Sequence, residues 1–124
     1  MQLTEHRNEN QFFLRHADAQ SVVVVDRPLR RSFALSATQI VEDLPAQSPD
    51  QIDTAIVESI LALKPEVVLL GTGARTVFPP QAVLAQFLKR GIGLETMDSA
   101  AAARTFNVLA GEGRIVVAVF LLAG

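Results

Sequence analysis

The chain has 124 residues, of which 49% are hydrophobic and 19% are charged, as is typical of one globular domain that builds its own core. Its formal net charge is only -2, so no overall field draws it to nucleic acid or to anionic lipid. Because the chain contains no cysteine, disulfides, thiolate catalysis and sulfur-ligated metals are excluded.

The first predicted elements are two short runs of β-branched or alternating apolar residues, at positions 21–25 and 31–35. The stretch between them contains Pro28, which suits a turn, so we predict an N-terminal β-hairpin. The turn also carries a cluster of arginines, Arg27, Arg30 and Arg31. We interpret this cluster as solvated, since the chain has no Tyr or Trp to stack on nucleic-acid bases.

A helix is predicted after the hairpin. Ser48 and Gln51 have the spacing of a capping box, and Pro49 would occupy the first helical position. Apolar residues then recur at helical spacing, at Ile52, Ile56, Ile60 and Leu63. This pattern predicts a helix that begins near Ser48 and ends near Lys64 and Pro65.

Strands and helices alternate through the rest of the chain. Residues 66–70 are a predicted strand, in which the run 67–70 is apolar on both faces, as in a buried parallel strand. Residues 92–95 and 114–122 are predicted strands as well. The last of these runs is nearly all apolar, which predicts an inner strand covered on both faces.

Two helices separate these strands. Pro79 and Pro80 open the first, whose packing face carries Val83, Leu84, Phe87 and Leu88. Asp98 or Ser99 caps the second, which ends at Gly111 and packs through Phe106, Leu109 and Ala110. The order of elements predicts a single compact α/β domain over residues 1–124, with three layers, a central β-sheet, helices on both of its sides and the added hairpin.

A glycine-bracketed loop, Gly71-Thr72-Gly73-Ala74-Arg75, follows the predicted strand at 66–70. Glycines let a backbone approach a ligand closely, and open α/β sheets bind ligands at the carboxyl ends of strands. Gly71, Thr72, Gly73 and Arg75 are therefore candidate contacts for an anionic ligand or a partner. The alternative is a tight turn without a ligand, with Arg75 in solvent.

A second candidate group belongs to the last predicted helix and the turn after it. Arg104 and Asn107 are three residues apart and share a helix face, where a cation and an amide can meet one anionic or polar group. Arg114 is the third candidate. The structural alternative pairs Arg104 with a surface carboxylate, uses Asn107 to bond a nearby backbone, and lets Glu112 and Arg114 stabilise a turn.

Motifs for cofactors, metals and catalysis are incomplete. Thr76 stands where a dinucleotide fingerprint needs its third glycine, and the next helix waits until Pro80. His6 and His16 have no third metal ligand at a suggestive spacing, and no nucleophile elbow or zinc-protease motif occurs. We therefore expect no cofactor and no metal, and the sequence favours a protein that is not an enzyme.

Several ordered segments together resemble a known family. Residues 71–73, 91–97, 103–109 and 112–114 are similar to a family of small bacterial and archaeal domains of unknown function, related to the mitochondrial assembly factor three of the NADH dehydrogenase alpha subcomplex. The resemblance implies a three-layer α/β fold with a central mixed sheet whose last strand runs against its neighbours. It also implies binding to other proteins and no established catalysis. Phe106 and Ala103 replace a tyrosine and a cysteine common in the family.

Two functional hypotheses follow. The first is a non-catalytic interaction domain whose protein partners take part in assembly of a membrane complex. The second is a small-molecule binder or enzyme that holds an anionic ligand at residues 71–75. In both, we expect a monomer or homodimer in the cytoplasm, without nucleic acid and without membrane insertion, because residues 1–8 lack a signal core and the longest apolar run is far shorter than the ~20 residues of a spanning helix.

Overall fold

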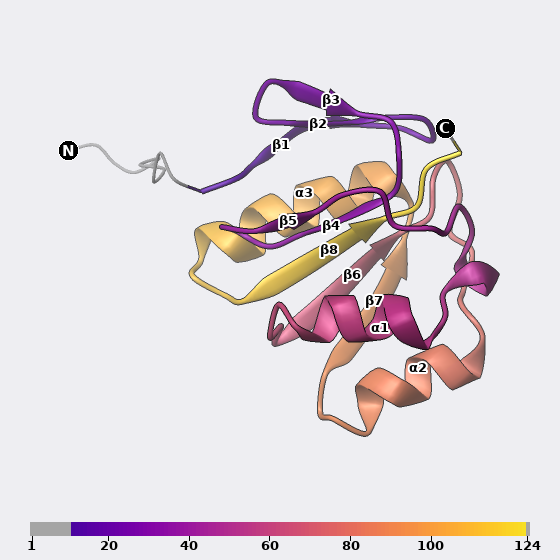
Figure 1. Ribbon diagram of the computed structural model, residues 1–124. Helices are drawn as coiled ribbons and strands as arrows, with labels where there is room; N and C mark the ends of the chain where they lie inside the picture. The colour runs from indigo at the N-terminus through magenta and orange to yellow at the C-terminus, as the bar shows by residue number, and fades with distance from the viewer. Residues whose placement is uncertain (1–10, 124) are drawn as a thin grey trace.

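The computed structural model describes residues 11–123, which form a five-stranded sheet, a three-stranded sheet and the helices that cover them (Figure 1). His6 and the segment inspected for a signal sequence lie outside the described residues. Within residues 11–123, every helix is too short or too polar to cross a membrane.

The five-stranded sheet has the order β5-β4-β8-β6-β7. Its strands are β4 (Phe33–Leu35), β5 (Ile40–Val41), β6 (Val67–Gly71), β7 (Gly93–Met97) and β8 (Val116–Phe120). Strand β6 runs parallel to both β7 and β8, whereas β4 runs antiparallel to β8 and β5. The central mixed sheet is confirmed. The last strand, β8, is expected to run antiparallel to its neighbours; it does so only for β4, and the expectation is wrong for β6.

Helices cover both faces of this sheet, as predicted. Side chains of α1 (Thr54–Leu61) and α2 (Gln81–Leu88) share one apolar core with Val68, Leu70 and the odd-numbered residues of β8. On the other face, α3 (Ser99–Gly111) shares a second core with Leu69 and the even-numbered residues of β8. All five residues of β8 are buried, so the prediction of an inner strand is confirmed.

The first helix begins later than predicted. Residues Pro49–Gln51 form one turn of 3-10 helix, and Ser48 makes no side-chain cap. Ile52 is then extended, which interrupts the helical path, and the Asp53 carboxylate caps α1 by accepting a hydrogen bond from Ile56 N at 3.0 Å. The helix ends at Leu61, and the chain reverses through Lys64, whose φ is +56°.

The N-terminal hairpin is present, but it pairs residues other than those predicted. Strand β2 (Val22–Val24) pairs with β3 (Arg27–Leu29), which lies in the predicted turn, and β1 (Leu14–Ala17) adds a third strand on the far side of β2. Residues 33–35 leave the hairpin to join β8, where the rings of Phe33 and Phe120 stack with centroids 5.2 Å apart. The burial of both rings in the main core explains this choice of partner.

The three-stranded sheet packs against α3 on the side away from α1 and α2 (Figure 1). Its buried side chains join those of α3 in a single core, namely Leu14, Val22, Val24 and Leu29 with Ala102, Ala103 and Phe106. The small sheet therefore buries its apolar face on α3, and packing against a helix stabilises a hairpin that would be marginal in water by itself.

Candidate functional site

Strands β6, β7 and β8 are parallel and end at one edge of the large sheet, which we call the carboxyl edge. Three segments meet there. Leu121 N donates to Gly71 O at 2.9 Å, and Ala123 N donates to Ala19 O at 3.1 Å, so the chain after β8 ties the loop after β6 to the turn between β1 and β2. Open α/β sheets bind ligands at this edge, which makes it the first place to look for a site.

The loop after β6 is held by hydrogen bonds within the domain. Thr72 N donates to Met97 O at 3.0 Å, and Gly73 N donates to the buried Ser99 hydroxyl at 2.9 Å. Ser99 N in turn donates to Gly73 O at 2.8 Å. The loop is thus fixed to the start of α3, and the N–H groups of Thr72 and Gly73 are already used.

Packing and backbone conformation explain why positions 71 and 73 are glycine. A Cβ on Gly71 would lie 3.0 Å from the Phe120 ring and 3.1 Å from Ala102 Cβ, closer than ordinary contact. Gly73 has φ +89°, a left-handed conformation that side chains disfavour. Close packing and turn geometry therefore account for both residues without a ligand.

Beyond these glycines the loop turns outward. The Thr72 hydroxyl donates to Arg75 O and accepts from Val77 N at 3.0 Å, which closes the turn. Arg75, Val77 and Phe78 are exposed, and the solvent-accessible fractions of Val77 and Phe78 are 42% and 71%. An apolar pair and a cation are therefore presented together on a loop that its own hydrogen bonds hold in shape.

Asn107 faces the small sheet. Its Nδ2 donates to Leu14 O at 2.7 Å and its Oδ1 accepts from Leu14 N at 2.9 Å, so the amide joins α3 to β1 as a neighbouring strand would. Arg104, one turn earlier on α3, is exposed. Of the two alternatives left open for Asn107, the geometry shows a bond to backbone.

Arg114 lies at the opposite edge of the sheet from the glycine loop. It precedes β8, and its Nε lies 3.3 Å from the Glu66 carboxylate, just before β6 begins. Ile115 N also donates to Glu66 Oε1, at 3.0 Å, and these two donors lower the pKa of Glu66. The five residues of β6 separate Arg114 from Gly71, so the structure does not bring Arg114 together with residues 71–75.

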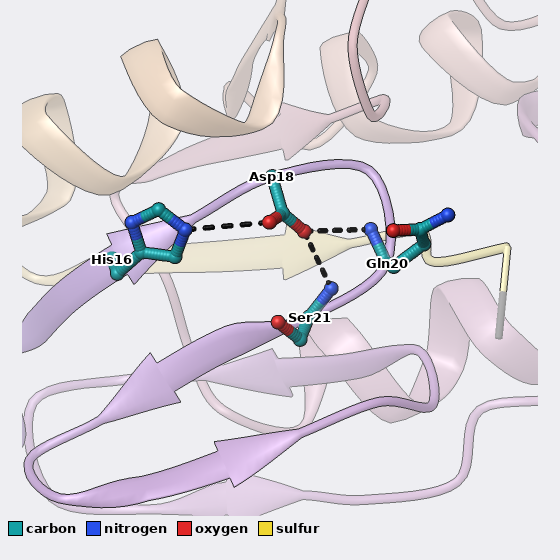
Figure 2. Close-up of polar contacts among 4 residues, drawn as sticks. All are labelled: His16, Asp18, Gln20 and Ser21. Atoms are coloured by element: carbon teal, nitrogen blue, oxygen red, sulfur yellow. Dashed lines mark hydrogen bonds and ion pairs between the residues drawn. The ribbon is translucent and has the colours of Figure 1, made fainter.

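The turn between β1 and β2 adds a polar cluster near the carboxyl edge. Figure 2 shows the Asp18 carboxylate accepting from Gln20 N and Ser21 N, both at 2.9 Å, with His16 Nε2 at 3.3 Å on its other side. The two backbone donors, followed by His16, lower the pKa of Asp18. All these polar atoms serve the turn itself.

An open groove of about 680 Å³ lies on the β8 and β4 side of the carboxyl edge. Its floor includes the buried residues Leu44, Ala46 and Leu122, and the exposed Arg30 and Arg31 belong to its lining. None of the candidate residues from the sequence lines it. Sequence reasoning placed the arginines in a solvated turn, and nothing local could reveal the groove, because its lining joins segments that are far apart in the chain.

Residues 14–121 match the family described as protein of unknown function (DUF498/DUF598). The chain belongs to this family. A Francisella tularensis protein named 13 kDa major membrane protein is 35% identical over 93 residues, which cover 70% of this chain and 72% of that protein. The NADH dehydrogenase (ubiquinone) 1 alpha subcomplex assembly factor 3 of Danio rerio is 45% identical over 56 residues. Those residues cover 45% of this chain and only 32% of the assembly factor.

Solved structures confirm the fold. A Xanthomonas campestris protein with an NMR structure is 45% identical, with a TM-score of 0.85 over 100% of this chain and 94% of that one. A Bordetella pertussis protein described as an Mth938-like domain is 26% identical, with a TM-score of 0.81 and the same coverage. The predicted relation to this assembly factor is supported by the matches to the Danio rerio and Homo sapiens proteins, and the family is described as one of unknown function.

Alanine substitutions at two glycines test whether close packing requires a glycine at position 71. We expect Gly71→Ala to lower the free energy of unfolding by about 1–3 kcal/mol, because the added methyl crowds Phe120 and Ala102. Gly93→Ala is the matched control, since a Cβ there meets nothing within 4 Å, and its effect should stay within about 0.5 kcal/mol. Urea denaturation measures both, and equal losses would contradict the packing explanation.

The amide of Asn107 is expected to be structural. Asn107→Ala removes both bonds to Leu14 and leaves the backbone of β1 without that partner, which should cost about 2–3 kcal/mol of stability. Arg104→Ala, on the same helix and exposed, should change stability by less than about 0.5 kcal/mol. If thermal and urea unfolding showed the same loss for both variants, the bond to Leu14 would not be the cause.

The lowered pKa of Asp18 predicts how the stability of the fold depends on pH. Its pKa is lower in the folded protein than in the unfolded chain, so its carboxylate stabilises the fold above the unfolded pKa, and this contribution is lost as pH falls through the folded pKa. Asp18→Asn keeps an acceptor for Gln20 N and Ser21 N but has no charge. We expect the wild type to be more stable near pH 7, and the difference to shrink toward pH 3. Urea denaturation across this range would refute the assignment if the difference stayed constant.

Proposed function

We propose that this chain is a non-catalytic protein-interaction domain that supports assembly of a membrane-associated complex. The observation that carries the proposal is the exposed pair Val77 and Phe78, in the loop that leaves the carboxyl edge. Fully burying an aromatic or aliphatic side chain is worth about 1.5–3 kcal/mol, so this loop would gain free energy when a partner covers it. The name of the related assembly factor supports the same class of function.

The loop is ordered before any partner arrives. The Thr72 hydroxyl bonds Arg75 O and Val77 N, and Pro79 is buried directly after Phe78. Since both ends of the loop are fixed, Phe78 is held outward rather than collapsed on the domain. Preorganisation of this kind lowers the entropy lost on binding, which favours recognition by a small surface.

Arg75 supplies a polar contact beside the apolar pair. Arginine and aromatic residues are enriched among the side chains that dominate binding energy at protein interfaces. The anionic-ligand alternative at residues 71–75 has less support, because the N–H groups of Thr72 and Gly73 donate within the domain. In this proposal the domain lies in the cytoplasm and meets the membrane complex from its aqueous side.

Affinity capture of the tagged protein from its native cells, after mild crosslinking and detergent extraction, tests the proposal. We expect subunits of a respiratory or other membrane complex to be enriched reproducibly. Phe78→Ser should lower that enrichment about tenfold, because the loss of an anchoring aromatic costs more than about 1.4 kcal/mol of binding.

Val108→Ser is the matched control, since Val108 is 59% accessible but lies on α3, away from the loop. This variant should retain the captured subunits at the wild-type level. The proposal would be wrong if no membrane-complex subunit were enriched, or if both serine variants lost the partners equally.

A further inference from the structure

Strand β7 is the outermost strand on one lateral side of the large sheet, and its free side is called its edge below. It pairs with β6 along all five of its residues, Gly93–Met97, and no strand of residues 11–123 lies on its other side (Figure 1). The opposite edge of the sheet is formed by β5, which has only two residues. A long unpaired edge presents a row of backbone donors and acceptors, which makes β7 a template for another strand.

The hydrogen bonds identify which groups of β7 point outward. Met97 O accepts from Thr72 N, so the backbone polar groups of Met97 face β6. Because the direction of these groups alternates along a strand, those of Glu95 and Gly93 also face β6, while those of Leu94 and Thr96 face away. Among residues 11–123, no hydrogen bond involves the outward groups of Leu94 or Thr96.

The side chains along this edge are small or directed away from it. A Cβ on Gly93 would meet nothing within 4 Å, so the start of β7 is open space. Leu94 packs against the core shared with α2, and Met97 against the core shared with α3. Glu95 is exposed, and its carboxylate forms no ion pair or hydrogen bond with any residue of the part that the structure describes.

We infer that the free edge of β7 accepts an extended segment of a partner protein that places a lysine or arginine opposite Glu95. This inference deepens the proposed function and rests on it, since it states the chemistry of the partner. The segment adds a sixth strand through the two donors and two acceptors of Leu94 and Thr96. A cation across from Glu95 forms a cross-strand pair of opposite charge, which stabilises pairing by about 0.2–1 kcal/mol.

A second copy of this chain fits the edge less well in the two registers that are centred on Glu95 and on Leu94. A two-fold antiparallel pair centred on Glu95 would satisfy all four outward groups, but it would set the two Glu95 carboxylates directly opposite each other. Centring the pair on Leu94 separates these charges and brings Thr96 opposite Ile92 of the other copy. Ile92 N already donates to Phe87 O at 3.0 Å, so Thr96 O would then have no donor.

Two synthetic peptides test the inference. Both have nine residues that alternate threonine and valine, with lysine at the centre of one and glutamate at the centre of the other. Titration of the ¹⁵N-labelled full chain with millimolar peptide, followed by NMR, gives the affinity of each. We expect the lysine peptide to bind about fivefold more tightly, and the shifts and slowed amide exchange to centre on Leu94 and Thr96.

Two variants supply the controls. Glu95→Lys should invert the preference, so that the glutamate peptide binds more tightly. Thr96→Pro removes one outward donor without touching a bond to β6, and it should weaken both peptides about fivefold. Because Glu95 is exposed, its variant keeps the test decisive even if the proline variant fails to fold.

In the peptide titrations, any of three results overturns the inference. These are no binding of the lysine peptide to the wild type, an unchanged preference in Glu95→Lys, or slowed exchange at Leu94 and Thr96 that grows with protein concentration alone. The last result would assign the edge to a second copy. If capture of membrane-complex subunits is lost in Phe78→Ser but kept in Glu95→Lys and Thr96→Pro, the edge inference fails while the proposed function stands.

Discussion

Strand β6 is hydrogen-bonded on both sides, and the direction in which it runs decides where every candidate surface lies. Because β7 and β8 are parallel to it, the ends of three strands meet at one edge, together with the turn at Ala19. A parallel sheet also requires crossovers, and these place α2 and α3 on opposite faces. Gly71 permits this arrangement, since no larger residue fits between β6, Phe120 and Ala102 without displacement.

The glycine loop shows how one pattern supports two interpretations. From the sequence, two glycines after a buried strand predict either a ligand or a tight turn, and nothing in residues 71–75 decides between them. The decisive groups are Ser99 and Phe120, which bond or pack against the loop from positions 26 and 49 residues away from Gly73 and Gly71, respectively. A contact of that separation leaves no trace in local spacing.

The long elements were predictable because their periodicity is carried by many residues. The apolar run 67–70 and the stripe of α3 each repeat a signal over more than one turn or pleat. Strands of two to four residues, such as β1, β3 and β5, have no such repetition. Residues 33–35 illustrate the limit, since their alternation suits a hairpin equally well, and only the Phe120 ring, 87 residues after Phe33, selects β8 as the partner.

The loop that leads to Phe78 begins next to the end of β7. The bond from Thr72 N to Met97 O places the carboxyl end of β7 beside the start of the loop. The two contacts differ in kind, because backbone pairing along β7 is insensitive to sequence, whereas burial of Phe78 and the charge opposite Glu95 select a particular partner. A partner is recognised specifically when it makes both a general contact and a selective one.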